Sequence, residues 1–205
     1  MEQKELSLTQ LKAIYTPCLA RDFPPDELMP FHRLEALTQA KSQVALGFYD
    51  SQGLAAYAIF ILRPGSPAAL LNYFAVQPHC RGQGLGTACL RQLGHAAQDF
   101  GAGYVVFEVE SPSHAPSPAN REIRQKRVGF YLQGGAKATS VSSWLYGVDY
   151  NIMILPGQAP PTGNRQIKED LEDLYHIVVP SRLSRGRAFS DVCRVWSSEG
   201  GGATA

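Results

Sequence analysis

Residues 70–87 read LLNYFAVQPHCRGQGLGT, an apolar run followed by a cluster of glycines. The apolar and aromatic residues at 70–76 predict a β-strand. Leu85, Cys89 and Leu93 then recur at helical spacing with polar residues between them, so a helix should begin at the end of this stretch. The stretch therefore predicts a strand, a glycine-rich loop and the start of a helix.

The glycines suit this loop to binding an anion. Gly82, Gly84 and Gly86 lie within five residues, which lets the backbone approach a ligand closely. Several backbone N–H groups are unpaired at a helix start, and the helix dipole adds about half a positive charge there. A pyrophosphate is the ligand that such a loop is expected to bind.

Two other glycine-rich phosphate loops are excluded. A Walker A loop needs Gly-Lys-Ser/Thr, and no lysine occurs between Lys41 and Lys126. A dinucleotide fingerprint, Gly-x-Gly-x-x-Gly, fails because Thr87 stands where its third glycine belongs. An ordinary glycine-rich turn without a ligand is the remaining alternative.

On both sides of this stretch the pattern predicts a mixed sheet. Residues 44–50 and 54–62 are apolar runs joined by a short turn, which predicts a hairpin. A second short turn leads into 70–76, so these strands should be antiparallel. The β-rich run 104–110 should lie parallel to 70–76, because a helix connects the two. The other expected elements are helices at 9–19, 27–40, 119–132 and 164–179 and a strand at 150–155. Pro30 should confine the regular part of the second helix to the residues that follow it.

A second segment, RVGFYLQGGA at residues 127–136, follows the first by one strand and one loop. Together the two segments resemble the GNAT acetyltransferase superfamily, in which Arg/Gln-x-x-Gly-x-Gly opens one helix and Phe/Leu-Tyr ends a later one. The resemblance covers roughly residues 44–155 and does not identify a substrate. Many members carry Asn seven residues before the tyrosine that corresponds to Tyr131. This chain has Arg124 there, and the nearest asparagine is Asn120.

The resemblance implies an α/β fold. We expect a mixed, mostly antiparallel sheet with helices on both faces and a V-shaped split between its central parallel strands. The acetyltransferase domain should occupy residues 1–155, followed at 156–205 by a linker, a C-terminal helix and a flexible tail. The C-terminal helix is expected to cover the acceptor side or to mediate self-association.

The resemblance also implies acetyl-CoA as the donor of an acetyl group. Its pyrophosphate would lie on the loop, and its pantetheine arm would pair with the end of strand 70–76. The acceptor would be an amine, on a small molecule or a protein. The expected cofactor contacts are Phe74, Ala75, Val76, Arg81, Gly82, Gln83, Gly84, Leu85, Gly86, Thr87 and Tyr131.

Three side chains are candidates for proton transfer. By resemblance, the hydroxyl of Tyr131 would protonate or hydrogen-bond the leaving thiolate. Glu108 and Glu110 share one face of their strand, because strand side chains alternate, and a partly desolvated carboxylate there could act as the base. We favour Glu108, although a solvated or salt-bridged acid at a strand end explains either residue equally well.

Several other residues have simpler explanations. The pair His79-Cys80 could form a nucleophile, but adjacent residues in a turn usually point apart. His114 could line the acceptor site or stand in solvent. The basic helix with Arg121, Arg124, Lys126 and Arg127 could meet phosphates or an acidic substrate, or form a solvated face.

Composition narrows the remaining function classes. The net charge is +1 and no basic stripe is present, so nucleic acid is not an expected partner. The apolar run 54–62 is too short to span a membrane, and the four cysteines form no CxxC or metal-ligand spacing. We therefore expect a cytoplasmic monomer or homodimer without a metal. Two alternatives to N-acetyl transfer stay open: a coenzyme A-binding module without turnover, or an acyltransferase using another acyl donor or a hydroxyl acceptor.

Overall fold

The computed structural model describes residues 1–179 and 188–198. Within these residues the strands form one eight-stranded sheet in the order β1-β2-β3-β4-β5-β7-β6-β8. β4 and β5 are parallel and the other neighbouring pairs are antiparallel. This confirms the mixed, mostly antiparallel sheet that we expected.

The element bounds agree with the expected ones to within a few residues in the central part of the chain. The strands are β1 (Glu2–Glu5), β2 (Gln43–Asp50), β3 (Gly53–Leu62), β4 (Ala68–Val76), β5 (Tyr104–Glu110), β6 (Lys137–Leu145), β7 (Val148–Pro156) and β8 (Cys193–Ser197). The helices are α1 (Leu8–Ile14), α2 (Ala20–Asp22), α3 (Phe31–Gln39), α4 (Leu85–Ala96), α5 (Pro118–Gln133) and α6 (Asn164–Val178).

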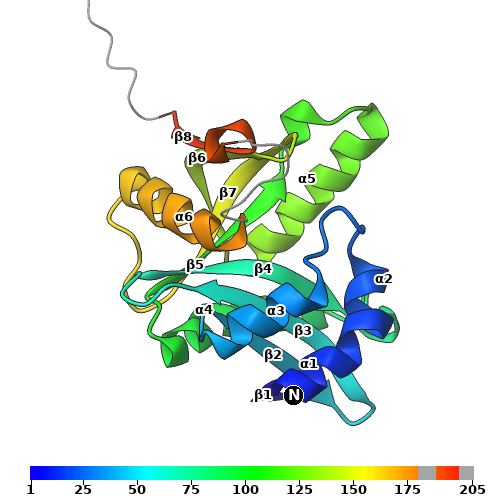
Figure 1. Cartoon of the computed structure of the whole chain (residues 1–205). Coiled ribbons are helices and arrows are strands. Elements are labelled where there is room, and N and C mark those ends of the chain that lie inside the picture. The colour runs from blue at the N-terminus through cyan, green and yellow to red at the C-terminus, as the bar shows by residue number, and fades with distance from the viewer. Residues whose placement is uncertain (180–187, 199–205) are drawn as a thin grey trace, which may run out of the picture.

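Helices cover both faces of the sheet (Figure 1). On one face, α1 and α3 pack on β3 through residues such as Leu34, and α6 packs on β5 and β7 through Leu171. On the opposite face, Leu90 of α4 lies in a third cluster, against which Phe130 of α5 also packs. The side chains of β5 alternate between the two faces, so this strand takes part in both cores.

The parallel strands separate partway along their length. β4 pairs with β5 only from Ala68 to Leu70. The register of β4 against β3 shifts directly afterwards, which leaves Asn72 as an extra residue in β4. A bulge bends its strand, so β4 turns away from β5 just beyond their last shared pair. This is the expected V-shaped split between the central parallel strands.

The first helix differs in detail from the prediction, and the second agrees with it. The helix expected at 9–19 starts at Leu8, because Ser7 and Gln10 form a capping box, and it becomes π-helical at Tyr15. The helix expected at 27–40, with its regular part after Pro30, begins at Phe31, in agreement with that expectation. Proline disfavours helical backbone at the residue before it, which explains this start.

Three strands were missed by the sequence analysis. β1 is a charged edge strand, and β6 is rich in Ser and lacks a long apolar run. β8 lies in the segment expected to be a flexible tail, yet it pairs with β6 and buries Cys193 and Val195. Residues 156–205 therefore contribute a strand to the same sheet, and the proposed division of the chain at residue 156 stays a prediction. The rest of the expected tail, residues 199–205, lies outside the described residues.

The helices of the described residues are too short or too polar to cross a membrane. The longest, α5, has 16 residues, against the roughly 20 that a membrane-spanning helix needs.

Candidate functional site

The glycine-rich loop connects β4 to α4 through backbone that favours glycine. Gly82 and Gly84 have φ angles of 76° and 77°, in the left-handed region that other residues adopt only under strain. Gly84 is also the N-cap of α4 and offers no side chain to bond the first helical amides. The loop therefore turns sharply and leaves the helix start open.

The loop presents a series of backbone N–H groups without acceptors. No hydrogen bond to a described residue is found for the amides of residues 82–87, whereas the Ala88 amide donates to the Gly84 carbonyl oxygen at 3.1 Å. These groups precede the positive end of the α4 dipole. A diphosphate could accept hydrogen bonds from several of them, so the loop fits the pyrophosphate predicted for it.

Gly86 lets α4 approach its neighbours closely. A Cβ atom at this position would lie 3.1 Å from the Phe130 ring and 3.1 Å from the Val76 side chain. The loop is thereby held against the end of β4 on one side and α5 on the other.

Arg81 anchors the loop to the rest of the molecule. Its Nε donates to the Val76 carbonyl oxygen at 2.8 Å, and its Nη2 lies 3.2 Å from Oδ1 of Asp22. The Tyr57 hydroxyl donates to the other oxygen of Asp22 at 3.0 Å, so these contacts join the loop to α2 and β3. In this structure Arg81 orders the loop, and its predicted contact with the cofactor stays a prediction.

The pair His79-Cys80 does not form a nucleophilic site in this geometry. Cys80 is buried, and its Sγ lies 3.6 Å from a carboxylate oxygen of Asp50, to which the thiol can donate. Burial and this carboxylate raise the pKa of the thiol, which is the opposite of what a reactive cysteine requires.

Tyr131 lies near the end of α5 and packs beside β5. Its ring centroid is 4.7 Å from that of Phe107 and 5.2 Å from that of Phe130. No hydrogen bond of its hydroxyl to a described residue is found, and burial raises the pKa of the phenol. Tyr131 is therefore a protonated donor at neutral pH, next to the strand that carries Glu108.

Glu108 lies in a desolvated environment on the face that α6 covers. Burial raises the pKa of its carboxyl to about 7, with a further contribution from Glu27. The Tyr175 hydroxyl opposes this shift, because it donates to Oε1 of Glu108 at 2.5 Å. A carboxyl with this pKa can both take up and release a proton near neutrality.

Glu110, two residues further along, is paired with two cations. Its oxygens lie 2.7 Å from Nη2 of Arg124 and 2.9 Å from Nη1 of Arg127. Arg124 also donates to the Ser111 carbonyl oxygen at 2.9 Å. The residue that replaces the expected asparagine thus ties α5 to the end of β5, and Glu110 matches the salt-bridged alternative.

Sequence reasoning missed three residues close to these glutamates. Glu27 lies in the connection between α2 and α3, where the Tyr73 hydroxyl donates to its carbonyl oxygen at 2.9 Å. Burial and then Glu110 raise the pKa of its carboxyl. Tyr150 pairs with Glu110 across β5 and β7. Tyr175 follows Leu171 by one helical turn, so its burial was predictable, but its contact with Glu108 was not.

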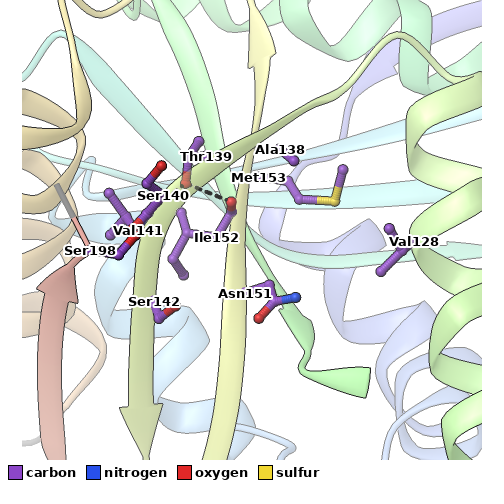
Figure 2. A pocket seen from close by; sticks show the side chains of 10 residues that line it. All are labelled: Val128, Ala138, Thr139, Ser140, Val141, Ser142, Asn151, Ile152, Met153 and Ser198. Atoms are coloured by element: carbon purple, nitrogen blue, oxygen red, sulfur yellow. Dashed lines mark hydrogen bonds between the residues drawn. The ribbon is translucent and has the colours of Figure 1, made fainter. Parts of the chain in front are cut away.

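The two cavities described in the structure lie elsewhere. One, of about 200 Å³, is lined by Val128 of α5, residues 138–142 of β6, residues 151–153 of β7 and Ser198 (Figure 2). There, Thr139 donates from Oγ1 to the Ile152 carbonyl oxygen at 2.7 Å. The other, of about 380 Å³, lies at the turn between β3 and β4. Neither is lined by residues 82–87, Tyr131 or Glu108, so neither cavity belongs to the candidate site.

Comparison with known proteins supports a specific family. A family model described as acetyltransferase (GNAT) family matches residues 8–119, which is more than half of the chain. The match includes the glycine loop, Glu108 and Glu110, but neither Tyr131 nor α6. No curated protein matches the sequence.

Several solved structures share the fold. The ribosomal-protein-S18-alanine N-acetyltransferase from Escherichia coli is 23% identical with a TM-score of 0.54, covering 80% of this chain and 96% of its own. A spermidine N-acetyltransferase mutant from Vibrio cholerae is 14% identical with a TM-score of 0.55, covering 76% and 95%. The aminoglycoside 6′-N-acetyltransferase from Enterococcus faecium is 15% identical with a TM-score of 0.57, covering 78% and 99%. At these identities the likeness concerns the fold alone.

Proposed function

The chain belongs to the GNAT acetyltransferase family, and from this we propose that it transfers the acetyl group of acetyl-CoA directly to an amine. The acceptor would be a small-molecule amine or a protein amino group. One arrangement carries the proposal. Amides at residues 82–87 that bond no described residue follow one strand of the split, and a carboxyl with a near-neutral pKa lies on the other.

The first strand and the loop would hold the donor. Acetyl-CoA supplies an activated thioester, and the amides of residues 82–87 would bind its diphosphate. The end of β4, at Phe74, Ala75 and Val76, has no pairing with β5 and could bond an extended arm through its backbone. Leu85 and Thr87 would contribute only their amides to this site.

Glu108 would remove the proton from the attacking amine, directly or through a water molecule. An alkylamine with a pKa near 10.4 is neutral in only about one molecule in 2,500 at pH 7, which costs about 4.6 kcal/mol before attack. A carboxyl with a pKa of about 7 is half ionised at that pH and can accept the proton. Glu110 is less suited to this role because two arginines already neutralise it.

Tyr131 would supply a proton, or a hydrogen bond, to the leaving thiolate. Its phenol is protonated at neutral pH and packs on Phe107, the residue next to Glu108. An acid and a base would thus approach the same stretch of β5 from its two faces.

A thiol-release assay tests the proposal. Acetyl-CoA and CoA should both raise the melting temperature, and a panel of polyamines, aminoglycosides and peptide N-termini should include an amine that releases free CoA. Glu108→Gln should slow that reaction by about 10²- to 10⁴-fold while acetyl-CoA still stabilises the protein. Mass spectrometry of the acceptor would identify the acetylated nitrogen.

Each other outcome points to a different function. Stabilisation by CoA without thiol release from any acceptor would favour a binding module. Release only with a longer acyl-CoA or a hydroxyl acceptor would change the donor or the acceptor class. Absence of any stabilisation would contradict the proposed role of residues 82–87.

A further inference from the structure

The C-terminal helix α6 brings one hydroxyl group to the proposed base. Tyr175 is fully buried, and its hydroxyl lies 2.5 Å from Oε1 of Glu108, which is 67 residues away in the sequence. On the other side, its oxygen lies 2.8 Å from Oγ of Ser143 in β6. Tyr175 and α6 lie outside residues 8–119, the part of the chain that matches the family model.

We infer that Tyr175 is a positioning residue of the acetyl-transfer site, which orients the Glu108 carboxylate and, with Ser143, stabilises its ionised form. The inference rests on the proposed role of Glu108 as the base. On this inference α6 has two roles: it covers one face of the sheet, and it contributes Tyr175 to the catalytic centre.

The direction of the hydrogen bonds follows from the chemistry of the groups. An ionised carboxylate can only accept, so Tyr175 donates to Glu108. The Tyr175 oxygen is then free to accept from Ser143, whose side chain is fully buried. Burial and the Glu108 carboxylate raise the pKa of the Tyr175 hydroxyl, so it keeps its proton throughout the neutral range.

This arrangement engages one oxygen of the base and leaves the other available. Tyr175 contacts Oε1, and within residues 1–179 and 188–198 no hydrogen bond to Oε2 of Glu108 is found. The rigid position of Tyr175 supports the orientation, because Leu171 and Leu174 on the same helix are fully buried in the core. Oε2 is therefore the atom that would meet the amine or a bridging water.

The other groups near Glu108 do not replace this donor. Glu27 from the α2–α3 connection raises the pKa of Glu108. Burial and then Glu108 raise the pKa of Tyr150 in β7 and of Cys193 in β8, but no hydrogen bond from either to Glu108 is found in the described part of the chain. Arg124 and Arg127 of α5 pair with Glu110, the other acid on the same strand. Tyr175 is thus the hydrogen-bond donor to the Glu108 carboxylate among the described residues.

A second buried tyrosine provides a matched control. Tyr104 of β5 is also fully buried, and its hydroxyl donates to Oδ2 of Asp170 on α6 at 2.6 Å. Tyr175→Phe and Tyr104→Phe each remove one hydrogen bond to a carboxylate between β5 and α6, and neither changes the packing volume by more than the hydroxyl. Only the first removes a partner of Glu108, and it also leaves the buried Oγ of Ser143 without its bond to Tyr175. The control therefore matches the lost carboxylate bond, and Ser143→Ala accounts for the second bond.

The decisive measurement is the pKa of Glu108 in the full chain, from a ¹³C NMR titration of labelled glutamate carboxyls assigned with Glu108→Gln. Tyr175→Phe should raise this pKa by about one pH unit, because the ionised form loses its donor. Ser143→Ala should raise it by less, and Tyr104→Phe should leave it unchanged. An unchanged value in Tyr175→Phe would overturn the inference, whatever the melting temperatures are.

The pH dependence of turnover gives the second readout. If the pKa rises from about 7 to about 8, the ionised fraction at pH 7 falls from one half to about one in eleven, so kcat/KM should fall about fivefold. The loss should disappear above about pH 9, where the base is ionised in both proteins, and KM for acetyl-CoA should not change.

The two proposals can fail separately. If Glu108→Gln retains full activity, Glu108 is not the base, and the positioning role of Tyr175 falls with it. If Glu108→Gln is inactive but Tyr175→Phe has the wild-type pKa and pH profile, the proposed function stands and Tyr175 serves only as core packing.

Discussion

The loop before α4 and the two glutamates of β5 belong to the two strands that separate, but they are built in different ways. The loop offers backbone amides, and its conformation depends on glycines within a few residues of one another. The glutamates offer side chains whose properties depend on α5 and α6. Glu108 and Glu110 are two residues apart, yet one has a raised pKa and the other is neutralised by arginines. Local sequence thus decides the conformation of the proposed anion site, and distant partners decide which acid is suited to the proposed role of base.

The largest expected effect comes from breaking the loop. Gly84→Val should weaken acetyl-CoA binding about a thousandfold, measured by isothermal titration calorimetry, because the side chain disfavours the φ of 77° that directs the amides to the diphosphate. Gly65→Val is the matched control. Gly65 also has a positive φ, of 80°, and open space around it, but it lies in the β3–β4 turn. Normal binding by Gly84→Val would remove the loop from the site.

A smaller effect on turnover is expected at Tyr131, which packs beside β5. Tyr131→Phe should lower kcat by about tenfold to a thousandfold with little change in acetyl-CoA affinity, since it removes only the hydroxyl group of the side chain. Tyr49→Phe on β2 serves as the control for a tyrosine far from β5. Equal turnover in the two variants would exclude Tyr131 from the mechanism.

The smallest effect sharpens the contrast between the two acids. Glu110→Gln should change kcat/KM by less than about threefold, because its carboxylate is already engaged by Arg124 and Arg127. Chemical denaturation should show a loss of about 1 kcal/mol in the free energy of unfolding, as expected for a partly exposed ion-pair network. A large rate loss in Glu110→Gln together with an active Glu108→Gln would reverse the two assignments.

Features that depend on neighbouring segments of the chain were predictable from the sequence. The hairpin at 44–62, the strand–helix–strand unit and the parallel pairing of 104–110 with 70–76 all follow from apolar periodicity and connection length. β8 also carried a weak signal, since Cys193 and Val195 alternate with Arg194 and Trp196. This strand has only five residues and lies beside a glycine-rich tail, so the alternation was too short to predict a strand.

Other features had no local signal. β1 is a strand because β2 offers it an edge, and β6 because β7 and β8 flank it. The position of Glu27 depends on its connection being held by Tyr73. The contacts from β2, β8 and Tyr73 come from partners far along the chain, which no periodicity within the segment can indicate, whereas β7 follows β6 after only two residues.

By itself the sequence determined the loop that we propose to bind phosphate, because glycine backbone and a helix start are properties of consecutive residues. Only the tertiary structure decided the character of the acids on β5. A carboxyl's pKa depends on desolvation and on the donors around it, and here these come from α5, β6 and α6. The fold therefore separated two glutamates between which the sequence supported only a preference.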